Sequence, residues 1–463
     1  MTSALPETAR SVLTRRFGER FREGRAIRDQ HAATTTWLSP QPPDAVVFAR
    51  STDEVAAVVA LCARERTPVI PFGAGSSLEG HLNAPSGGIS LDLTQMDRIL
   101  AVHPEDMDVV VEPGVTRTRL NAHLRDTGLF FPLDPGADAS LGGMAATRAS
   151  GTTAVRYGTM RDAVLALQAV MPDGSVIRTG SRARKSAAGY DLTRLLVGSE
   201  GTLGVITELT LRLQPQPEAV RALSCSFPDV RAACEAVIAT LQAAVPMARI
   251  ELMDRETVRA VNARSGVGLA DTPLLITEFH GSPGAVAEAE ATFRELAGGF
   301  GGGGFRTASS TEDRSRLWQA RHDVYWAVTA LRPGSRGLST DVCVPVSRLA
   351  DCMAAAESKA AAMDLFAPIA GHVGDGNFHH LILVDMADAD ERARVDEFVG
   401  WLNDLAISMG GTCTGEHGIG QGKRKYLARE AGPALGPMRA IKAALDPLGI
   451  MNPGKIFDPA AGD

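Results

Sequence analysis

The chain has 463 residues, of which 44% are hydrophobic and 22% are charged, and these values are typical of a folded soluble protein. Its formal net charge of −7 argues against a general nucleic-acid-binding protein, although single arginines can still hold small anions. No apolar run reaches the roughly 18 residues of a membrane span, and glutamate is mixed with arginine near the start, unlike a signal or transit peptide. The six cysteines lack metal-binding spacing, so free thiols in the cytoplasm are expected.

Residues 1–38 are expected to form a helical lead, because their apolar residues recur at the spacing of one helix face. From residue 39 onward, short apolar runs alternate with proline, glycine and aspartate, which indicates strands joined by tight turns. One helix is predicted over Thr52–Arg64. The proline-spaced segment LQPQPEA then predicts a domain boundary at residue 217.

Residues 218–463 are predicted to form a second α+β domain. Helices are expected over Val230–Ala244 and Pro283–Ala297, and strand-like runs precede and follow them. This order recurs further along the chain, so the sequence predicts a sheet with helices packed on one face. The glycine tract around Phe300 is expected to be a flexible loop.

Three glycine-rich segments in the first half could approach a ligand closely. PFGAGSSLEGH, residues 71–81, follows a short strand and offers consecutive backbone N–H groups that suit a pyrophosphate. It does not match the GxGxxG dinucleotide fingerprint, and on its own it could be a plain surface turn. FPLDPGADASLGGMAATRASG, residues 131–151, and GSEGTLGVIT, residues 198–207, are also rich in small residues and could instead be tightly packed loops.

Together with VVVEPGVT, RYGTMRD and the terminal MNPGK, these segments resemble the vanillyl-alcohol-oxidase class of FAD-binding proteins. The resemblance implies an α+β fold with a two-part PCMH-type FAD-binding domain over residues 39–217. An FAD-linked-oxidase substrate domain would follow over residues 218–463, with an antiparallel sheet covered by helices. The C-terminal segment would return to the FAD.

The resemblance also implies which residues hold the FAD. His81 lies too far beyond the GAGSS turn to match the histidine that carries a covalent flavin in some members, so noncovalent FAD is expected. The residues expected near the pyrophosphate are Pro71, Gly73, Gly75, Ser76 and Ser77. Those expected along the flavin and its ribityl chain are Pro135, Gly136, Ser140, Gly142, Gly143, Ser150 and Gly151, and those near the adenine half are Gly201, Gly204 and Ile206, with Asn452 reaching back from the terminus.

The segment GHVGDGNFHH contains three of the ten histidines of the chain. A tight turn centred on Asp375-Gly376 would place His372 directly opposite His379, with their Cβ atoms about 5 Å apart. Two imidazoles at that spacing can share one divalent ion, whereas His380 would point to the other face. Two stacked or hydrogen-bonded histidines on a polar face are the alternative.

A candidate third ligand lies in GTCTGEHGIGQGKRK, where Glu416 and His417 stand between glycines. Glu416 would complete a set of two histidines and one glutamate with an open coordination position, which is typical of a catalytic ion. His417 would then be available as a base. A glycine-rich helix start with a capping glutamate is the alternative.

The second half resembles the FAD-linked oxidase C-terminal domain of D-2-hydroxyacid dehydrogenases, which carries an HxGDGNxH hairpin and a later EHG. The resemblance runs from about residue 40 to 458 and is strongest to the D-lactate dehydrogenase branch. It implies that His372, His379 and Glu416 ligate a divalent metal, Zn²⁺ or Mn²⁺. It also implies that His417 is the catalytic base and that Arg321, in LWQARH, holds the substrate carboxylate.

The activity implied by this resemblance is oxidation of D-lactate, or a similar small D-2-hydroxy acid, by hydride transfer to FAD. The electron acceptor would be a cytochrome, a quinone or an electron-transfer flavoprotein rather than NAD. Leu381 and Tyr325 replace polar residues of the 2-hydroxyglutarate branch, which favours a small substrate. The protein is expected in the cytoplasm or bound peripherally at the inner membrane.

Other functions remain open from the sequence. A glycolate oxidase catalytic subunit or a D-2-hydroxyglutarate dehydrogenase would share the same half-reaction. A non-redox FAD transferase such as an alkyl-glycerone-phosphate synthase would share the fold. A metal-binding structural protein, whose glycine loops merely turn, would bind no FAD at all.

Overall fold

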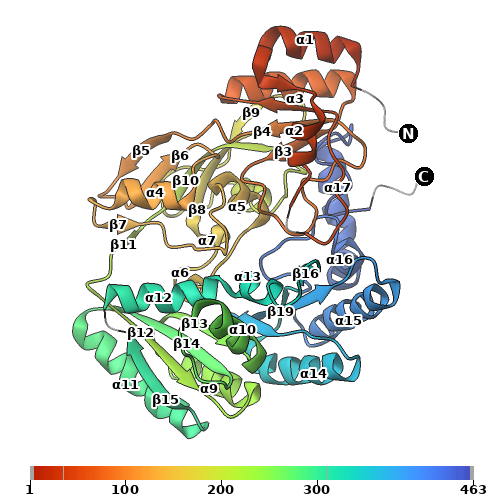
Figure 1. Cartoon of the computed structure of the whole chain (residues 1–463). Coiled ribbons are helices and arrows are strands. Elements are labelled where there is room, and N and C mark those ends of the chain that lie inside the picture. The colour runs from red at the N-terminus through yellow and green to blue at the C-terminus, as the bar shows by residue number, and fades with distance from the viewer. Residues whose placement is uncertain (1–4, 35, 309, 459–463) are drawn as a thin grey trace. The chain divides into compact units, whose positions relative to one another are not determined.

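The computed structural model describes residues 5–34, 36–308 and 310–458. Its helices and strands confirm the predicted α+β class (Figure 1). Among the described residues, no helix is long and apolar enough to cross a bilayer, and all six cysteines are free. The chain forms two compact units. The first comprises Met1–Ser150, Gly158–Gln216 and Glu416–Asp463, and the second comprises Gly151–Tyr157 and Pro217–Gly415.

The first sheet of the first unit has the strand order β1-β2-β4-β3, and β4 runs parallel to both β2 and β3. The helix α3 (Thr52–Glu65) connects β2 to β3, as a parallel arrangement requires. It begins after Ser51, whose hydroxyl accepts a hydrogen bond from the Glu54 N–H. The strands are β1 (Phe21–Arg22), β2 (Ala45–Phe48), β3 (Val69–Phe72) and β4 (Ile89–Asp92).

The N-terminal lead is helical only in part. The helices α1 (Glu7–Phe17) and α2 (Arg25–Gln30) are separated by η1 (Gly18–Arg20) and by β1. Phe21 is buried in β1 and pairs with Val47 of β2, so this part of the lead extends the sheet. The apolar spacing correctly predicted α1, but it could not predict the strand that follows.

The second sheet of the first unit is antiparallel, with the strand order β5-β6-β10-β8-β9. The short helix α5 (Leu141–Thr147) packs on β10, and its apolar side chains join the same hydrophobic core. The strands are β5 (Ile99–His103), β6 (Asp108–Val111), β8 (Val164–Val170), β9 (Val176–Arg178) and β10 (Val205–Arg212). The remaining elements before residue 217 are α4 (Arg117–Leu124), β7 (Leu129–Phe130), α7 (Met160–Ala163), α8 (Leu192–Leu196) and β11 (Gln214–Pro215).

The C-terminal segment completes the first unit. It contains α16 (Arg424–Ala431), η3 (Gly432–Ala434) and α17 (Leu435–Leu445). Beyond α17, Met451 forms a parallel bridge with Val69, and the N–H of Asn452 donates to the Val69 carbonyl at 2.8 Å. Residues 451 and 452 therefore lie beside β3, the strand that leads into the glycine loop of residues 71–77.

The second unit is built on one antiparallel eight-stranded sheet. Seven strands follow the order β15-β12-β14-β13-β18-β19-β16, and β17 also pairs with β19. The strands are β12 (Ala219–Ser226), β13 (Met247–Met253), β14 (Leu274–Gly281), β15 (Gly303–Ala308), β16 (Arg336–Ser339), β17 (Val342–Cys343), β18 (Ile369–His372) and β19 (Asn377–Val384). The glycine tract around Phe300 is thus only partly loop, because its last residues enter β15.

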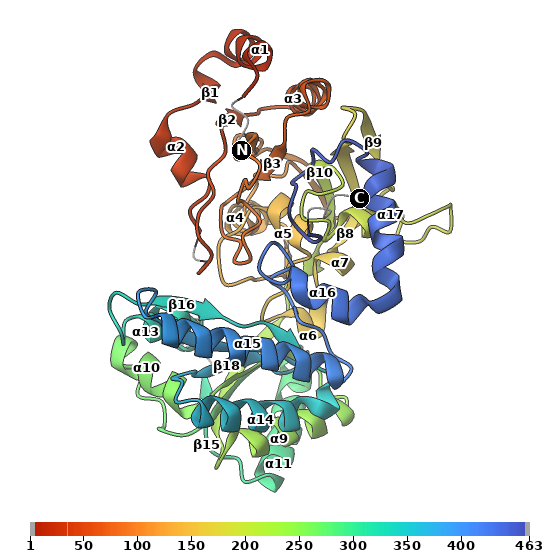
Figure 2. The same cartoon turned by 90° about the vertical axis from the view of Figure 1, so that its right-hand side faces the viewer.

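Helices cover both faces of this sheet, not one as predicted. On one face, Phe279 packs on Phe293 of α11, and His380 packs on Phe398 of α15. On the other face, Ile276 shares a core with Val258 of α10 and with helices α12 and α13. Figure 2 shows α14 beside α15, and α14 also contacts α9. The helices are α6 (Ala154–Tyr157), α9 (Val230–Gln242), α10 (Arg255–Ser265), α11 (Pro283–Gly299), α12 (Thr311–His322), α13 (Val324–Thr329), η2 (Val346–Arg348), α14 (Leu349–Ala362) and α15 (Ala389–Ser408).

Candidate active site

The glycine loop that follows β3 is packed closely against the other predicted FAD-binding segments. A Cβ atom on Gly73 would lie only 2.3 Å from the Ser140 hydroxyl. One on Gly201 would lie 2.9 Å from the Pro71 ring, and Gly201 also has a φ of +71° that side chains rarely adopt. The fold therefore brings together residues from three segments that are far apart in the sequence.

Two buried hydroxyl groups in this region fit a bound phosphate. The side-chain oxygens of Ser77 and Ser140 are buried, yet neither has a hydrogen-bond partner among the described residues. Leaving a buried hydroxyl without a partner is costly, so such groups usually contact a ligand or water. The pyrophosphate of FAD offers acceptor oxygens, and the residues present fit this group.

The remaining residues that are predicted to bind FAD differ in how closely other atoms surround them. Gly142 packs against Pro113, at a distance where a Cβ would clash, while nothing lies within 4 Å of the Gly136 position. Ile206 lies in β10, and its side chain belongs to the hydrophobic core. The other residues that are predicted to bind FAD are Gly75 and Ser76 of the loop, together with Pro135, Gly143, Ser150, Gly151 and Gly204.

Asn452 anchors the C-terminal segment through its side chain. Its side-chain amide donates to the Glu200 carbonyl at 2.7 Å, and its side-chain oxygen accepts from Lys455 at 2.9 Å. Lys455 also donates to the Asn83 carbonyl at 2.5 Å. Burial lowers the pKa of Lys455 to about 7. Residues 452–455 are thus tied to Glu200 in the third glycine-rich segment and to Asn83, two residues beyond the first.

Glu200, in the GSEG segment, fixes the chain just beyond the EHG motif. Its carboxylate accepts hydrogen bonds from the backbone N–H groups of Ile419 at 2.7 Å and Gly420 at 2.8 Å. The ring of His81 lies 3.2 Å from the same carboxylate. Burial by itself would raise the pKa of Glu200, but His81 and the two amides outweigh it and lower the pKa. The sequence analysis does not predict these contacts of Glu200, although a charged residue between glycines could have indicated them.

The histidine hairpin has a different register from the one predicted. In the structure His372 pairs with Asn377 and Ala370 pairs with His379, so His372 and His379 are diagonal neighbours. The strands are joined by the four residues between His372 and Asn377, where a two-residue turn was expected. Because the register changes by two residues in total, both histidines stay on the same face, and their ring centroids are 5.3 Å apart.

A contact outside the hairpin explains the longer turn. The Val344 N–H donates to the Gly376 carbonyl at 3.0 Å, and Gly376 has a φ of +79°. A Cβ atom at Gly376 would lie 2.0 Å from the Val344 carbonyl oxygen. The turn is therefore shaped by the neighbouring segment around β17.

Replacing Gly376 with alanine should destabilise the protein strongly. We expect a loss of at least about 2 kcal/mol, since backbone strain and overpacking each cost about 1–3 kcal/mol. Urea denaturation followed by circular dichroism measures this loss. Gly410→Ala is the matched control, because Gly410 has a similar φ of +81° but nothing within 4 Å of its Cβ position. Equal losses in the two variants would contradict the role of the Val344 contact.

Both hairpin histidines on the site face are oriented through Nδ1. The Nδ1 atom of His379 lies 2.7 Å from the Thr340 carbonyl oxygen, and that of His372 lies 2.7 Å from Glu251 Oε1. Because a carbonyl can only accept, Nδ1 of His379 must carry the proton. A neutral ring in this tautomer presents its Nε2 lone pair, which is the atom a metal ion would bind.

His380 points to the opposite face, as predicted. It pairs with Ile369, is fully buried, and packs edge-on against Phe398. Its Nδ1 atom lies 2.8 Å from the Ala367 carbonyl oxygen. Burial lowers the pKa of His380 to about 4, so the ring is neutral at neutral pH. Its role is therefore in packing.

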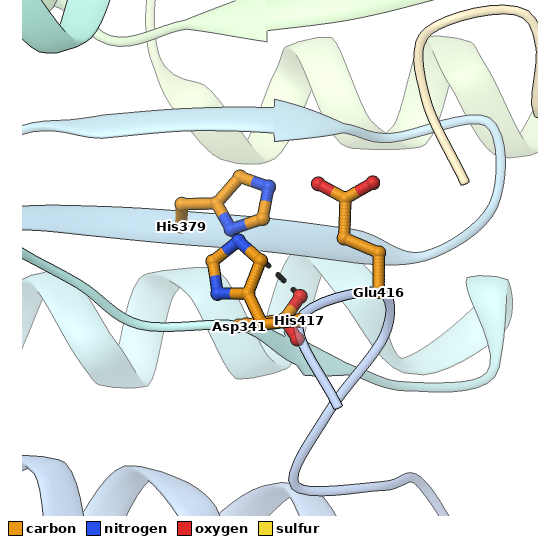
Figure 3. Close-up of side chains that lie close together, drawn as sticks. All are labelled: Asp341, His379, Glu416 and His417. Carbon is orange, nitrogen blue, oxygen red and sulfur yellow. Dashed lines mark ion pairs between the residues drawn. The ribbon is translucent and has the colours of Figure 1, made fainter. Parts of the chain in front are cut away.

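Four ionisable side chains gather where the chain leaves the second unit (Figure 3). They are Asp341, His379, Glu416 and His417, and their potential ligand atoms all lie within 4.8 Å of one another. Of the three predicted ligands, His379 and Glu416 are in this group and His372 is not, although its ring lies beside that of His379. The N–H of Gly415 donates to the Asp341 carbonyl at 2.9 Å, which holds the chain immediately before Glu416. Imidazole and carboxylate groups at this spacing suit a divalent ion such as Zn²⁺ or Mn²⁺.

Asp341 was not predicted as a site residue. Its carboxylate is buried and accepts hydrogen bonds from Asn377 at 3.0 Å and from the Thr414 hydroxyl at 2.7 Å. It also lies 3.9 Å from Nδ1 of His379, the ion pair drawn in Figure 3. The sequence signal was an acidic residue, in STDVCV, between two short strands.

Arg321 lies on α12 and is already engaged by a carboxylate. Its Nε and Nη2 atoms lie 3.0 Å and 2.7 Å from Oε2 of Glu251. These contacts use one edge of the guanidinium and leave its end-on edge, between Nη1 and Nη2, for another carboxylate. Leu381 lies on the same face of β19 as His379 and belongs to the apolar core shared with α12 and α13, and Tyr325 of α13 packs against that core.

Family models match both parts of the chain. The model described as the FAD-linked oxidase C-terminal domain matches residues 216–456, and the FAD-binding domain model matches residues 43–180. These matches confirm the two predicted parts of the chain, an FAD-binding domain and a C-terminal domain of the FAD-linked oxidases.

Two relatives cover most of the chain. A protein of Danio rerio named probable D-lactate dehydrogenase, mitochondrial, is 51% identical over 439 residues, which are 94% of this chain and 88% of that protein. A protein of Arabidopsis thaliana named D-lactate dehydrogenase [cytochrome], mitochondrial, is 45% identical over 460 residues, covering 99% of this chain and 80% of that protein.

The fold also matches a solved structure of p-cresol methylhydroxylase with bound substrate. The TM-score is 0.81, and the match covers 99% of each chain at 18% sequence identity, so it concerns the fold alone. The chain belongs to the family of FAD-linked oxidases with a PCMH-type FAD-binding fold, in the branch whose named members include D-lactate dehydrogenases.

Proposed function

We propose that this chain is an FAD-dependent dehydrogenase that oxidises D-lactate, or a similar small D-2-hydroxy acid, to the 2-oxo acid. The observation that carries the proposal is the cluster of His379, Glu416, His417 and Asp341 in a chain of the FAD-linked oxidase family. The names of the two relatives support D-lactate as the substrate.

Binding of the cofactors is assigned to residues that fit them. The hydroxyl of Ser77 would hold the FAD pyrophosphate, as the sequence predicts. Ser140 is predicted along the ribityl chain, and we reassign it to the pyrophosphate because of its closeness to Gly73, in the same loop as Ser77.

His379 and Glu416 would hold Zn²⁺ or Mn²⁺. His372, whose ring centroid lies 5.3 Å from that of His379, would be the third ligand. FAD would supply the hydride acceptor when bound, and the metal ion would supply a Lewis acid. His81 faces Glu200, which supports noncovalent attachment of the FAD.

The protein's own side chains would then bind the substrate and move its proton. Arg321 would bind the substrate carboxylate through the free end-on edge of its guanidinium. His417 would accept the proton of the C2 hydroxyl while the hydride leaves C2, so the substrate loses two electrons and two hydrogens to give the 2-oxo acid. The nearby Asp341 carboxylate would stabilise the imidazolium that forms.

The apolar surroundings favour a small substrate. Leu381 is buried on the face of β19 that carries His379, and Tyr325 packs beside the same core. Neither side chain offers a cation to a second carboxylate. A diacid such as 2-hydroxyglutarate would have to bury that carboxylate without a partner, which is costly. Lactate avoids this cost.

A cytochrome is the proposed electron acceptor, because the relative from Arabidopsis thaliana carries that word in its name. A quinone or an electron-transfer flavoprotein is the alternative electron acceptor. The cytoplasmic location stays a prediction from the sequence, while both relatives are named as mitochondrial proteins.

An anaerobic visible spectrum tests the substrate and the cofactor together. We expect D-lactate to bleach the flavin band of the purified protein, because hydride transfer reduces the flavin. L-lactate, glycolate and D-2-hydroxyglutarate, run in parallel, should bleach it more slowly. A flavin that no hydroxy acid bleaches would overturn the proposed reaction and favour a non-redox transferase, and faster bleaching by glycolate or 2-hydroxyglutarate would reassign the substrate.

A further inference from the structure

Glu251 connects two residues of the proposed site. It lies on β13, and its side chain is completely buried. One carboxylate oxygen, Oε1, is 2.7 Å from Nδ1 of His372. The other oxygen, Oε2, is 3.0 Å from Nε and 2.7 Å from Nη2 of Arg321. Each oxygen therefore serves a different partner.

The sheet register explains why the carboxylate lies there. β13 pairs with β18 so that Leu252 is opposite Gly371 and Met253 is opposite Ala370. Continuing this antiparallel register by one residue places Glu251 opposite His372. The helix α12 covers the same face of the sheet and brings Arg321 to the other side of the carboxylate.

A buried carboxylate in this strand needs a reason. Glu251 is flanked along β13 by Ile250 and Leu252, which are both buried. An ion pair with Arg321 alone would satisfy one oxygen and would be a structural contact. The second contact, to His372, is what links the carboxylate to the proposed metal ligand.

We infer that Glu251 is a positioning residue that orients His372 as a metal ligand and Arg321 as the substrate-carboxylate binder at the same time. This inference rests on the proposed function of those two residues. With Nδ1 of His372 bonded to a carboxylate, the ring is held in the tautomer whose Nε2 lone pair binds a metal. On the other side, the engaged Nε and Nη2 edge fixes the plane of the guanidinium.

The Glu251 carboxylate therefore positions both the proposed metal ligand His372 and the proposed substrate-binding residue Arg321. A change at Glu251 should act on metal affinity and on substrate affinity together, although Glu251 itself touches neither ligand. A purely structural ion pair would instead change the stability of the fold and leave the affinity for metal unaltered.

The test uses the full-length protein with FAD bound and the variant Glu251→Gln. The glutamine amide cannot accept from both partners, so we expect the Zn²⁺ affinity to fall by about 10- to 100-fold, as for other outer-shell partners of metal-bound histidine. Competition with a chromophoric chelator measures this affinity without any substrate. KM for D-lactate should rise more than kcat falls, because Arg321 is misaligned, and the flavin content should be unchanged.

Glu290→Gln is the matched control. Glu290 is also a buried carboxylate of the second unit, and it pairs with Arg221 and Arg294 instead of site residues. It should lose stability but keep the Zn²⁺ affinity of the original protein. An unchanged Zn²⁺ affinity in Glu251→Gln, or an equal loss in both variants, would overturn the inference.

A second variant decides the question if Glu251→Gln gives no soluble protein. Glu251→Asp keeps the charge but is one methylene shorter, so it cannot reach both partners, and its Zn²⁺ affinity should fall as well. The measurement also separates the inference from the proposed function. If D-lactate fails to reduce the flavin while Glu251 variants still bind Zn²⁺ more weakly, the proposed reaction fails and the orientation of His372 by Glu251 stands.

Discussion

Replacing His417 with alanine should lower kcat for D-lactate oxidation by about 10²- to 10⁴-fold, which is the usual contribution of a positioned base. His417 lies within the cluster of His379, Glu416 and Asp341, where a ring nitrogen can accept the hydroxyl proton. The flavin should stay bound, because the serine hydroxyls assigned to its pyrophosphate are Ser77 and Ser140. Stopped-flow measurement of flavin reduction isolates the affected step.

A histidine outside the site provides the control for this variant. His123 is exposed on α4, and His123→Ala should reduce the flavin at the original rate. A rate of flavin reduction in His417→Ala within about tenfold of the original would remove His417 as the base. A colourless His417→Ala protein would instead show that this residue contributes to FAD binding.

Removing the proposed metal ion should have an effect of similar size. We expect His379→Ala to lose its bound ion and to lower kcat by at least about 100-fold, because Lewis-acid stabilisation is worth several kcal/mol and about 1.4 kcal/mol is tenfold. Metal analysis of the purified variant and steady-state kinetics measure the two losses. Treating the original protein with a chelator should give the same loss, and adding Zn²⁺ or Mn²⁺ should restore activity only there.

The neighbouring histidine serves as the comparison. His380 is one residue away but faces the hydrophobic core, so His380→Ala should lose stability and keep its ion. A metal content that is unaffected in His379→Ala would exclude His379 as a ligand. Full activity in the metal-free protein would exclude the catalytic ion altogether.

The sequence predicted the face of the hairpin but not its register. The alternation of residues along the strands was enough to place His372 and His379 together and His380 apart. The turn length depends on the hydrogen bond between Val344 and Gly376, which are 32 residues apart in the numbering. A local turn rule contains no information about such a neighbour, so the predicted two-residue turn was wrong.

The hydrogen-bond partners of the site residues could not be predicted from the sequence for the same reason. Glu251 lies 70 residues before Arg321 and 121 residues before His372, so only the folded sheet brings the three together. The sequence did contain a local signal, because Glu251 is a charged residue between Ile250 and Leu252, which are both buried. The same holds for Asp341, an acidic residue between two short strands. Its contacts with Asn377 and Thr414 are known only from the folded structure.

The route of the chain through its two units has a consequence for the order of folding. The first unit needs Met451 beside Val69 and the Glu200 contacts to Ile419 and Gly420, whereas the second unit lies mostly in one uninterrupted stretch, Pro217–Gly415. During synthesis the second unit can be complete on the ribosome while the first still lacks its last segment. The cofactor loop would therefore be framed only after the second unit is complete, and FAD capture would follow that step.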